Sequence, residues 1–566
     1  MSPDASAAAG RTDLVLCWHM HQPEYRDTAS GRYLRPWSYL HGIKDYTDMA
    51  AVIEAVPEAR AVINFSPTLL EQIEDYAAQL RAHLERGTAL RDPVLAWLAA
   101  DHLPGGAEVR REIAAQGLRA NAQRMIERFP AYARLAALAR QALAEPAVLG
   151  YLADPFFFDL LVWHHLAWCG ESLRRADPRI AALLAREAGF DRSDRRSLLA
   201  AIADALAGII PRYRALADAG RIELSVTPYS HPILPLLLDL ASAREAVPDL
   251  PLPHAHYPGG AERTRWQLDA AKTVFERYFG RAPVGCWPSE GALSAPSLEL
   301  IAAAGFQWAA SGQQVLHHST APTGDDACIH HAYRLGALPT LCFFRDDGLS
   351  DKIGFEYQSW RAEDAVADLV HHLENIDRAC RDRQHRVIAI ILDGENCWEH
   401  YPHNGDFFLP ELYRTLGRHP RFNLTTFAAS AAAAQPLPLP KLVAGSWVYG
   451  TLTTWIGDPD KNRAWEMLCT AKGVCDQVLA DAALDTTRRG AIERQLALCE
   501  ASDWFWWFGD YNPADAVAEF DQLYRGHLRH LYQLLDRPVP AELTAVGFRG
   551  RGSPELGGVM RRGRSG

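Results

Sequence analysis

The sequence lacks the surplus of basic residues that nucleic-acid-binding proteins carry. Its 566 residues include 58 Lys and Arg against 69 Asp and Glu, which gives a formal net charge of −11 at pH 7. Basic residues gather only in the short tail RRGRSG at 561–566. Since binding to phosphate backbones needs a dense basic face, we expect no nucleic-acid partner.

Long apolar runs are also missing. No stretch of about 18 uncharged apolar residues occurs, and the opening MSPDASAAAGRTD has no basic segment followed by an apolar run. We therefore expect neither membrane insertion nor export, and predict a cytoplasmic protein with no membrane partner. The 48% hydrophobic and 22% charged residues are typical of a soluble globular protein.

The cysteines show no regular spacing. Ten of them are scattered between Cys17 and Cys499 without a Cys-x-x-Cys pair, which we interpret as buried free thiols. Histidine pairs such as His330-His331 receive no role. We expect no metal and no cofactor.

Tryptophan, in contrast, is abundant. The chain has 16, and several stand beside polar residues, among them the run Trp504, Trp506 and Trp507. Planar rings next to hydrogen-bonding groups suit stacking on sugars, although tryptophan also fills protein cores.

Seven short apolar runs indicate buried strands. They do not alternate with polar residues, as is typical of strands covered on both faces. Helical patterns lie between them, and repeated strand and helix predict an α/β protein with a parallel sheet or barrel. The runs are 14–18, 61–65, 222–226, 284–287, 307–311, 340–344 and 387–392.

The alternation of strands and helices is interrupted in two places, where amphipathic stretches follow one another without a convincing strand. One is an insertion at about 69–220, and the other follows the Pro-rich stretch AAAAQPLPLP. The predicted organisation is a disordered tail at 1–12, a catalytic domain at 13–430 that includes the insertion, a connector at 431–442, a helical domain at 443–540 and a flexible tail at 541–566.

Polar residues directly follow five of the predicted strands. Because the C-terminal ends of parallel barrel strands open on one face, we expect these side chains to converge on one cleft. They include His19, His21, Gln22, His231, Glu290, Asp346 and Asp393.

Glu290 and Asp393 are the pair we single out. Each follows a strand and has a tryptophan nearby, and two carboxylates in an aromatic cleft are what glycosidic cleavage requires. Either acid alone could be an N-cap or turn residue. Together with the histidines, they favour catalysis.

Five motifs carry a family resemblance. In order they resemble the five sequence regions of glycoside hydrolase family 57, whose members are retaining enzymes of α-glucans, and the likeness covers about residues 13–540. The motifs are WHMHQPEY (18–25), GRIELSVTPYSHPILPLL (220–237), CWPSEGALS (286–294), ILDGENCWEHYPHNG (391–405) and SWVYGTLTTWIGDPDKNRAW (446–465).

The resemblance implies an irregular (β/α)7 barrel with a helical insertion, followed by an all-helical domain that completes the cleft. It places Glu290 at the nucleophile and Asp393 at the general acid/base, with His19 and His21 lining the subsite of the scissile sugar. The further substrate-binding candidates are Gln22, Glu223, His231, Trp287, Asp346, Glu395, Trp398, Trp447, Tyr449 and Trp455.

The fourth region refines the expected activity. DGEN followed by an aromatic residue and Glu resembles the α-amylase and amylopullulanase branch, which predicts cleavage of α-1,4 and possibly α-1,6 bonds in glycogen, starch or maltodextrin. A 4-α-glucanotransferase or branching enzyme is the alternative on the same scaffold. The sequence does not determine the oligomeric state.

Two other classes of function are open. His19 and His21 stand at i and i+2 of a strand and so face the same way, as ligands of a metal-dependent hydrolase or deacetylase would. A glucan-binding protein without catalysis would need the tryptophans but not two placed acids, and the presence of Glu290 and Asp393 argues against it.

Overall fold

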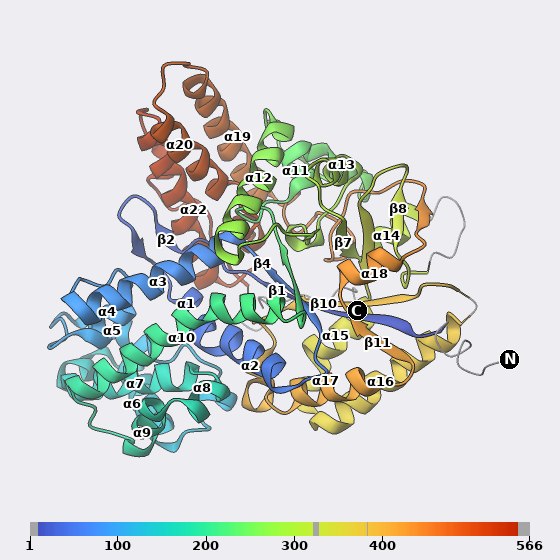
Figure 1. Ribbon diagram of the computed structural model, residues 1–566. Coiled ribbons are helices and arrows are strands. Elements are labelled where there is room, and N and C mark those ends of the chain that lie inside the picture. Colours follow the sequence, from blue (N-terminus) through green and yellow to red (C-terminus); the bar gives the residue numbers. More distant parts are fainter. Residues whose placement is uncertain (1–9, 321–327, 382, 553–566) are drawn as a thin grey trace.

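The structure is a computed structural model that describes residues 10–320, 328–381 and 383–552 (Figure 1). The tails predicted at 1–12 and 541–566 lie largely outside these ranges. Within them, Thr12 already belongs to the first strand, and Phe548 stacks on Phe508 with 4.0 Å between ring centroids.

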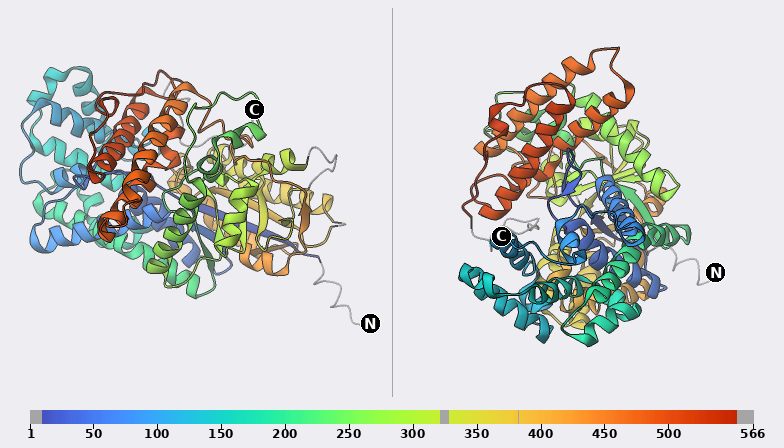
Figure 2. Two further views of the ribbon diagram at one scale, coloured as in Figure 1. Left: turned by 90° about the horizontal axis from the view of Figure 1, so that it is seen from above. Right: turned by 90° about the vertical axis from the view of Figure 1, so that its left-hand side faces the viewer.

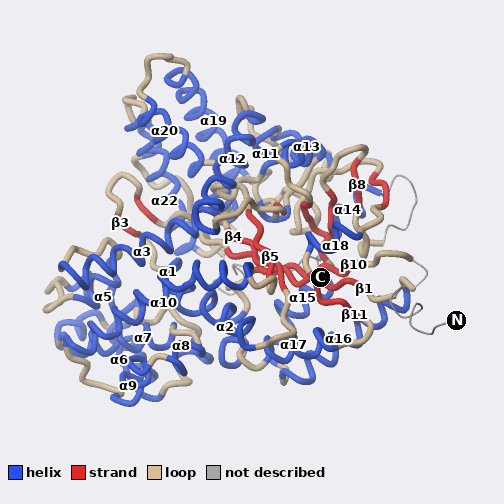
Figure 3. Tube along the Cα trace, in the orientation of Figure 1, coloured by secondary structure: helices blue, strands red, loops and turns tan. Residues whose placement is uncertain are grey.

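Seven parallel strands form a closed barrel, which confirms the predicted fold. The strands follow one another around the barrel in chain order, and the pairing of Ala389 with Arg345 closes the circle between the last two. Figure 3 shows them gathered at the centre of the molecule with helices around them. They are β1 (Thr12–Met20), β4 (Ala61–Phe65), β5 (Ile222–Val226), β6 (Gly285–Cys286), β7 (Trp308–Gly312), β9 (Leu341–Arg345) and β10 (Val387–Asp393).

The strands lack alternation because both of their faces are buried. In β1, Val15 and Cys17 belong to the apolar cluster that also holds Trp287 and Trp308, whereas Leu14 and Leu16 belong to the larger core shared with the helices. Successive side chains point to opposite faces of a strand, so both sets must be apolar.

Short strands extend or accompany the barrel. β11 (Phe422–Thr425) pairs with β1 in parallel, and β8 (Tyr333–Leu335) pairs with β9 in antiparallel fashion. The Pro-rich segment contributes β12 (Leu437–Leu439), which lies parallel to β8. β2 (Arg26–Asp27) and β3 (Arg32–Tyr33) form a separate hairpin.

Helices surround the strands and connect them. The first two precede β4, and the others follow β5, β6, β7, β9, β10 and β11. They are α1 (Trp37–His41), α2 (Thr47–Ala55), α11 (Leu234–Leu238), α12 (Gly260–Phe279), α13 (Ala295–Ala303), α14 (Gln313–Thr320), α15 (Asp347–Asp351), α16 (Ala362–Ala379), α17 (Phe408–Arg418) and α18 (Phe427–Ala433).

The chain between β4 and β5 contains helices joined by loops and no strand, and it lies at the lower left of Figure 1. Its long last helix packs along the first one. We call this segment the helical insertion. It consists of α3 (Pro67–Arg86), α4 (Pro93–Ala99), α5 (Ala107–Gln116), α6 (Pro130–Ala144), α7 (Asp154–Trp168), α8 (Glu171–Ala176), α9 (Pro178–Arg186) and α10 (Arg192–Asp218).

Four C-terminal helices complete the structure, and Figure 2 shows from two sides that they form one group. Among the described helices, none combines the length and apolar character that crossing a bilayer requires. The C-terminal helices are α19 (Pro459–Leu479), α20 (Thr486–Cys499), α21 (Ser502–Trp507) and α22 (Ala514–Leu534).

The segment before α19 passes directly over the end of β7. A Cβ atom at Gly312 would lie 2.6 Å from the Cα of Trp447, so only glycine permits this approach. The backbone N–H of Trp447 then donates to the carbonyl of Glu290 at 3.1 Å. This contact brings the fifth-region motif to the C-terminal ends of the barrel strands.

Candidate active site

A cleft of about 970 Å³ opens at the C-terminal ends of the barrel strands. Its walls come from three parts of the chain: the strand ends, the helical insertion with Arg119 and Trp168, and the C-terminal helices with Asp503 and Trp506. Seven of the residues predicted from sequence line it, namely His19, His21, Gln22, Glu290, Asp393, Glu395 and Trp447.

Glu290 follows β6 in a short 3-10 turn and has a left-handed backbone, with φ 58° and ψ 22°. This conformation is unusual for a residue with a side chain and costs about 1–3 kcal/mol. The indole N–H of Trp447 donates to Glu290 Oε2 at 2.8 Å, and His231 Nδ1 lies 4.0 Å from Oε1. The turn and these two partners fix the direction of the carboxylate.

Asp393 ends β10 and is partly exposed. The side-chain amide of Asn396 donates to its Oδ2 at 2.9 Å. Burial at the strand end raises the pKa of Asp393 to about 6, against the opposing effects of Asn396, His21 and Arg345. A carboxyl group with such a pKa exchanges a proton near neutral pH, as a general acid/base must.

Glu395 has a different environment although it is only two residues away. It is buried and accepts hydrogen bonds from the backbone N–H of His21 at 3.1 Å and from the Gln22 amide at 3.2 Å. Burial, followed by the charge of Asp393, raises the pKa of Glu395 well above its usual value. Glu395 therefore holds the segment after β1 in place beside Asp393.

Three histidines stack beside the acids. His21 lies on His231 with 3.8 Å between ring centroids, and His19 Nε2 is 3.1 Å from His231 Nε2. Asn64 contacts His19 Nδ1 at 2.7 Å, and Ser502 contacts His231 Nδ1 at 2.8 Å. Burial, with the charge of His21 second, lowers the pKa of His19 to about 3 and that of His231 well below its usual value.

The same cluster tests whether a metal ion could bind in the cleft. His21, His231 and Asp503 place ligand atoms within 4.8 Å of one another. However, the two rings are only 12° from parallel, so their in-plane lone pairs do not meet at one point. His21 Nε2 also contacts Asp503 directly at 2.9 Å. This arrangement does not fit a shared ion.

Three of the other predicted tryptophans lie behind the cleft. Trp287 is fully buried and meets Trp447 edge-on at 5.2 Å. Trp398 is buried and donates to the Gly394 carbonyl at 3.0 Å. Trp455 is also buried and packs 5.9 Å from Trp506. These residues contact the cleft only through their neighbours.

The remaining predicted residues lie elsewhere. Glu223 is inside the sheet and accepts from the indole N–H of Trp308 at 2.6 Å. Tyr449 is 39% exposed and does not line the cleft. Asp346 contacts His330 at 2.9 Å.

Several cleft residues were missing from the predicted site. Arg345 donates to the Ile391 carbonyl at 2.8 Å, and its guanidinium lies 5.5 Å from the Trp447 ring. A second group forms an aromatic wall, defined as Trp37, Trp506, Trp507 and Phe520. Trp506 and Trp507 belong to a run that suits stacking on sugars, but nothing in the sequence assigned them to this cleft.

The model of glycosyl hydrolase family 57 matches residues 15–437. The chain belongs to this family. No curated protein sequence is significantly similar to the chain.

Solved structures of several enzymes share its fold. A branching enzyme from Thermococcus kodakaraensis aligns with a TM-score of 0.59 at 14% identity, over 94% of this chain and 93% of that one. The α-amylase AmyC from Thermotoga maritima aligns with a TM-score of 0.54 at 14% identity, over 96% of this chain and 95% of that one. The 4-α-glucanotransferase from Thermococcus litoralis gives 0.51 at 12% identity, over 92% of this chain and 60% of that one.

Proposed function

We propose that this family 57 protein is a retaining glycoside hydrolase of α-glucans, with Glu290 as nucleophile and Asp393 as general acid/base. One observation carries the proposal: both acids line one cleft, in different environments. The Trp447 indole orients Glu290, while burial raises the pKa of Asp393 to about 6. Glycoside cleavage needs two carboxyl groups with different roles, and two acids in such different environments suit it.

The reaction then has two steps. In the first, Asp393 gives its proton to the glycosidic oxygen while Glu290 attacks the anomeric carbon, so the leaving sugar departs and a glycosyl ester forms on Glu290. In the second, Asp393 takes a proton from water, and the water oxygen replaces Glu290 at the anomeric carbon. The product keeps the α configuration because the carbon is inverted twice.

The proposed substrates are glycogen, starch or maltodextrin, cut at α-1,4 and possibly α-1,6 bonds. The DGEN motif at 393–396 supports an amylase or amylopullulanase type, and the α-amylase AmyC shares the fold. The aromatic wall supports a carbohydrate ligand, since flat rings stack on the apolar faces of sugars.

Chain transfer is the second candidate. A sugar hydroxyl in place of water would attack the same intermediate, and the branching enzyme and the glucanotransferase use this fold. Trp506 and Trp507 support it, because both line the cleft and offer flat rings on which an acceptor sugar could stack.

The test is product analysis on amylose, pullulan and glycogen. We expect shorter oligosaccharides whose reducing ends first appear as the α anomer in a time-resolved NMR spectrum. New α-1,6 branches or longer chains without a gain in reducing ends would instead identify a transferase. First products in the β anomer would refute the retaining mechanism. Protein carrying Glu290→Gln, purified in parallel, controls for contaminating amylases.

A further inference from the structure

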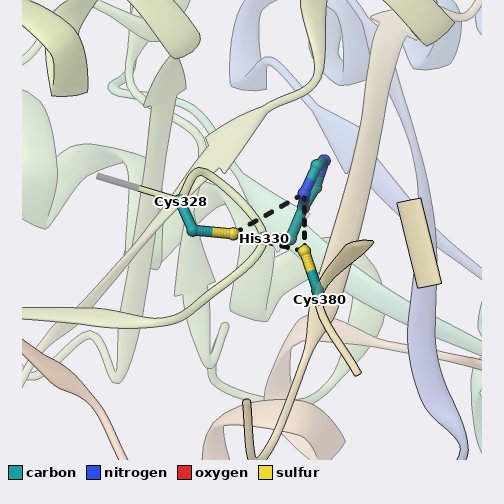
Figure 4. A group of neighbouring side chains, drawn as sticks. All are labelled: Cys328, His330 and Cys380. Atoms are coloured by element: carbon teal, nitrogen blue, oxygen red, sulfur yellow. Dashed lines mark hydrogen bonds between the residues drawn. The ribbon is translucent and has the colours of Figure 1, made fainter. Parts of the chain in front are cut away.

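Cys328, His330 and Cys380 form a compact cluster that is separate from the cleft lining (Figure 4). Cys328 and His330 precede β8, whereas Cys380 follows the last residue of α16. The two sulfur atoms are 3.6 Å apart, and each lies 3.8 Å from His330 Nδ1. The sulfur separation is far longer than the roughly 2.05 Å of a disulfide bond.

We propose that these three side chains bind a Zn²⁺ ion. Zinc takes sulfur ligands at about 2.3 Å and histidine nitrogen at about 2.0–2.1 Å in a tetrahedron, so neighbouring ligand atoms stand about 3.8 Å (two sulfurs) and about 3.6 Å (sulfur and nitrogen) apart. The observed triangle has edges of 3.6, 3.8 and 3.8 Å. It therefore matches one face of such a tetrahedron.

The other side of the imidazole supports the same conclusion. His330 Nε2 lies 2.9 Å from Asp346 Oδ2, so Nε2 carries the hydrogen and donates it to the carboxylate. The lone pair of Nδ1 is then directed toward the two sulfur atoms. A carboxylate behind a histidine ligand is the usual support of zinc sites, since it sets the tautomer and the ring orientation.

Hydrogen bonds to neighbouring elements also position the cluster. The backbone N–H of Val387 donates to the His330 carbonyl at 3.0 Å, and the Tyr333 hydroxyl donates to the Cys328 carbonyl at 2.7 Å. Asp346 Oδ1 accepts from the N–H of Leu349 at 2.9 Å. These bonds tie the backbone of Cys328 and His330 to β8 and β10, and the supporting carboxylate of Asp346 to α15.

The charges balance as well. Both thiols lose their protons to solvent on binding, and two thiolates neutralise the ion, which suits a partly buried site. Cys328 and His330 are partly exposed, so a water molecule can take the fourth position. Because the site lies outside the cleft lining, the ion would join the segment before β8 to the end of α16 rather than act on substrate.

The experiment is metal analysis of the full-length protein, kept reduced and incubated with zinc before desalting. We expect about one zinc per chain, and about none in Cys328→Ala/Cys380→Ala. Cys469→Ala, which removes a buried thiol on α19, should keep the metal. Asp346→Asn should weaken zinc binding about 10- to 100-fold in a competition with a chromogenic chelator.

Cobalt gives a second readout that uses the unaltered chain. Replacing zinc by Co²⁺ should produce the near-ultraviolet thiolate-to-metal absorption of a two-sulfur site together with the visible bands of a tetrahedral ion. Wild-type protein with far less than one zinc per chain, or zinc retained in the double variant, would overturn the proposal. So would a thiol titration of unreduced, denatured protein that falls two short of the ten cysteines in wild type but finds all eight in Cys328→Ala/Cys380→Ala, because the pair would then be a disulfide.

Discussion

Among the described residues, two clusters each place the ligand atoms of three side chains within 4.8 Å of one another, but the lone pairs of these atoms point in different directions. In the cleft, His21 and His231 stack 12° from parallel, and Asp503 already contacts His21. The second cluster, called the outer cluster, consists of Cys328, His330 and Cys380. Its two sulfur atoms and His330 Nδ1 form a triangle whose edges have the lengths expected between ligands of a tetrahedral zinc ion. By ligand type and distance alone, both clusters would count as candidate metal sites.

The difference assigns opposite roles to the two clusters. In the cleft, His19 contacts Asn64 and His231 contacts Ser502, so nitrogens of both rings are already engaged. At the outer cluster, Asp346 engages only the far nitrogen of His330. We therefore expect acid/base catalysis without a metal in the cleft and a structural metal outside it.

The largest effect should come from the acids. Glu290→Gln and Asp393→Asn should each lower turnover by roughly a hundredfold or more, since an essential general acid or nucleophile is lost. Added zinc should restore nothing. Turnover on amylose measures the loss, with Glu363→Gln and Asp364→Asn on the exposed start of α16 as matched controls. If either cleft variant kept more than about a tenth of the activity, its assignment would be wrong.

The pH dependence should separate Asp393 from the histidines. The proposed mechanism needs a protonated Asp393 in the first step. Its pKa is raised to about 6, so kcat/KM should fall about tenfold per pH unit above pH 6. His19 and His231 have lowered pKa values and stay neutral there. A pH–rate profile measures this fall above pH 6. If the same fall remained in Asp393→Asn, the assignment would be contradicted.

The same shift affects stability with a definite sign. The folded state raises the pKa of Asp393 from 3.8, which means that it favours the neutral carboxyl. This contribution is complete below about pH 4 and is lost as the pH rises through about 6. Thermal unfolding of wild type and Asp393→Asn at several pH values should therefore differ most above pH 6.

The fold could be predicted because each strand carries its own sequence pattern. Apolar runs without alternation mark strands that are buried on both faces, and six of the seven runs match their strands closely. The run 284–287 was too long, since β6 contains only Gly285–Cys286. Pro288 follows Trp287 and has no N–H to donate, which ends the ladder there.

The site was predictable where it depends on strand ends and, for Trp447, where the fifth motif of the family resemblance pointed to the cleft. Glu290, Asp393 and the residues after β1 reach the cleft because parallel strands end on one face. Trp506 and Trp507 reach it through the docking of α21, which no local pattern encodes. Glu223 lies within its strand rather than at the end, and there it contacts Trp308.

The outer cluster was even harder to predict from local sequence. His330 was given no role, and Cys328 and Cys380 were read as free thiols, because no metal-ligand spacing joins residues this far apart. The cluster forms only when β8 and the end of α16 meet beside β9. Long-range packing, not local sequence, creates it.

Substitutions in the aromatic wall should reduce activity moderately, by weakening substrate binding rather than the chemical step. Trp507 stacks on Phe520 with 5.1 Å between ring centroids and 14° between planes. Trp507→Ala should raise KM for long glucans about three- to tenfold, as the loss of one stacking contact implies, with little change in kcat. Initial rates on amylose measure this. A loss of kcat equal to that of the acid variants would place Trp507 in the chemical step instead.

The smallest effect on activity should come from removing the proposed zinc. Exhaustive chelation should leave the initial rate at moderate temperature unchanged, because Asp393 and Glu290 need no Lewis acid. It should lower the apparent Tm by a few degrees, since a ligand bound only to the folded state stabilises it. The variant Cys328→Ala/Cys380→Ala should show no such response to the chelator. If the rate instead fell in proportion to the zinc removed and returned on adding it back, the metal would take part in the reaction. The stacked histidines would then have to rearrange to hold it, and the contrast between the two clusters would fail.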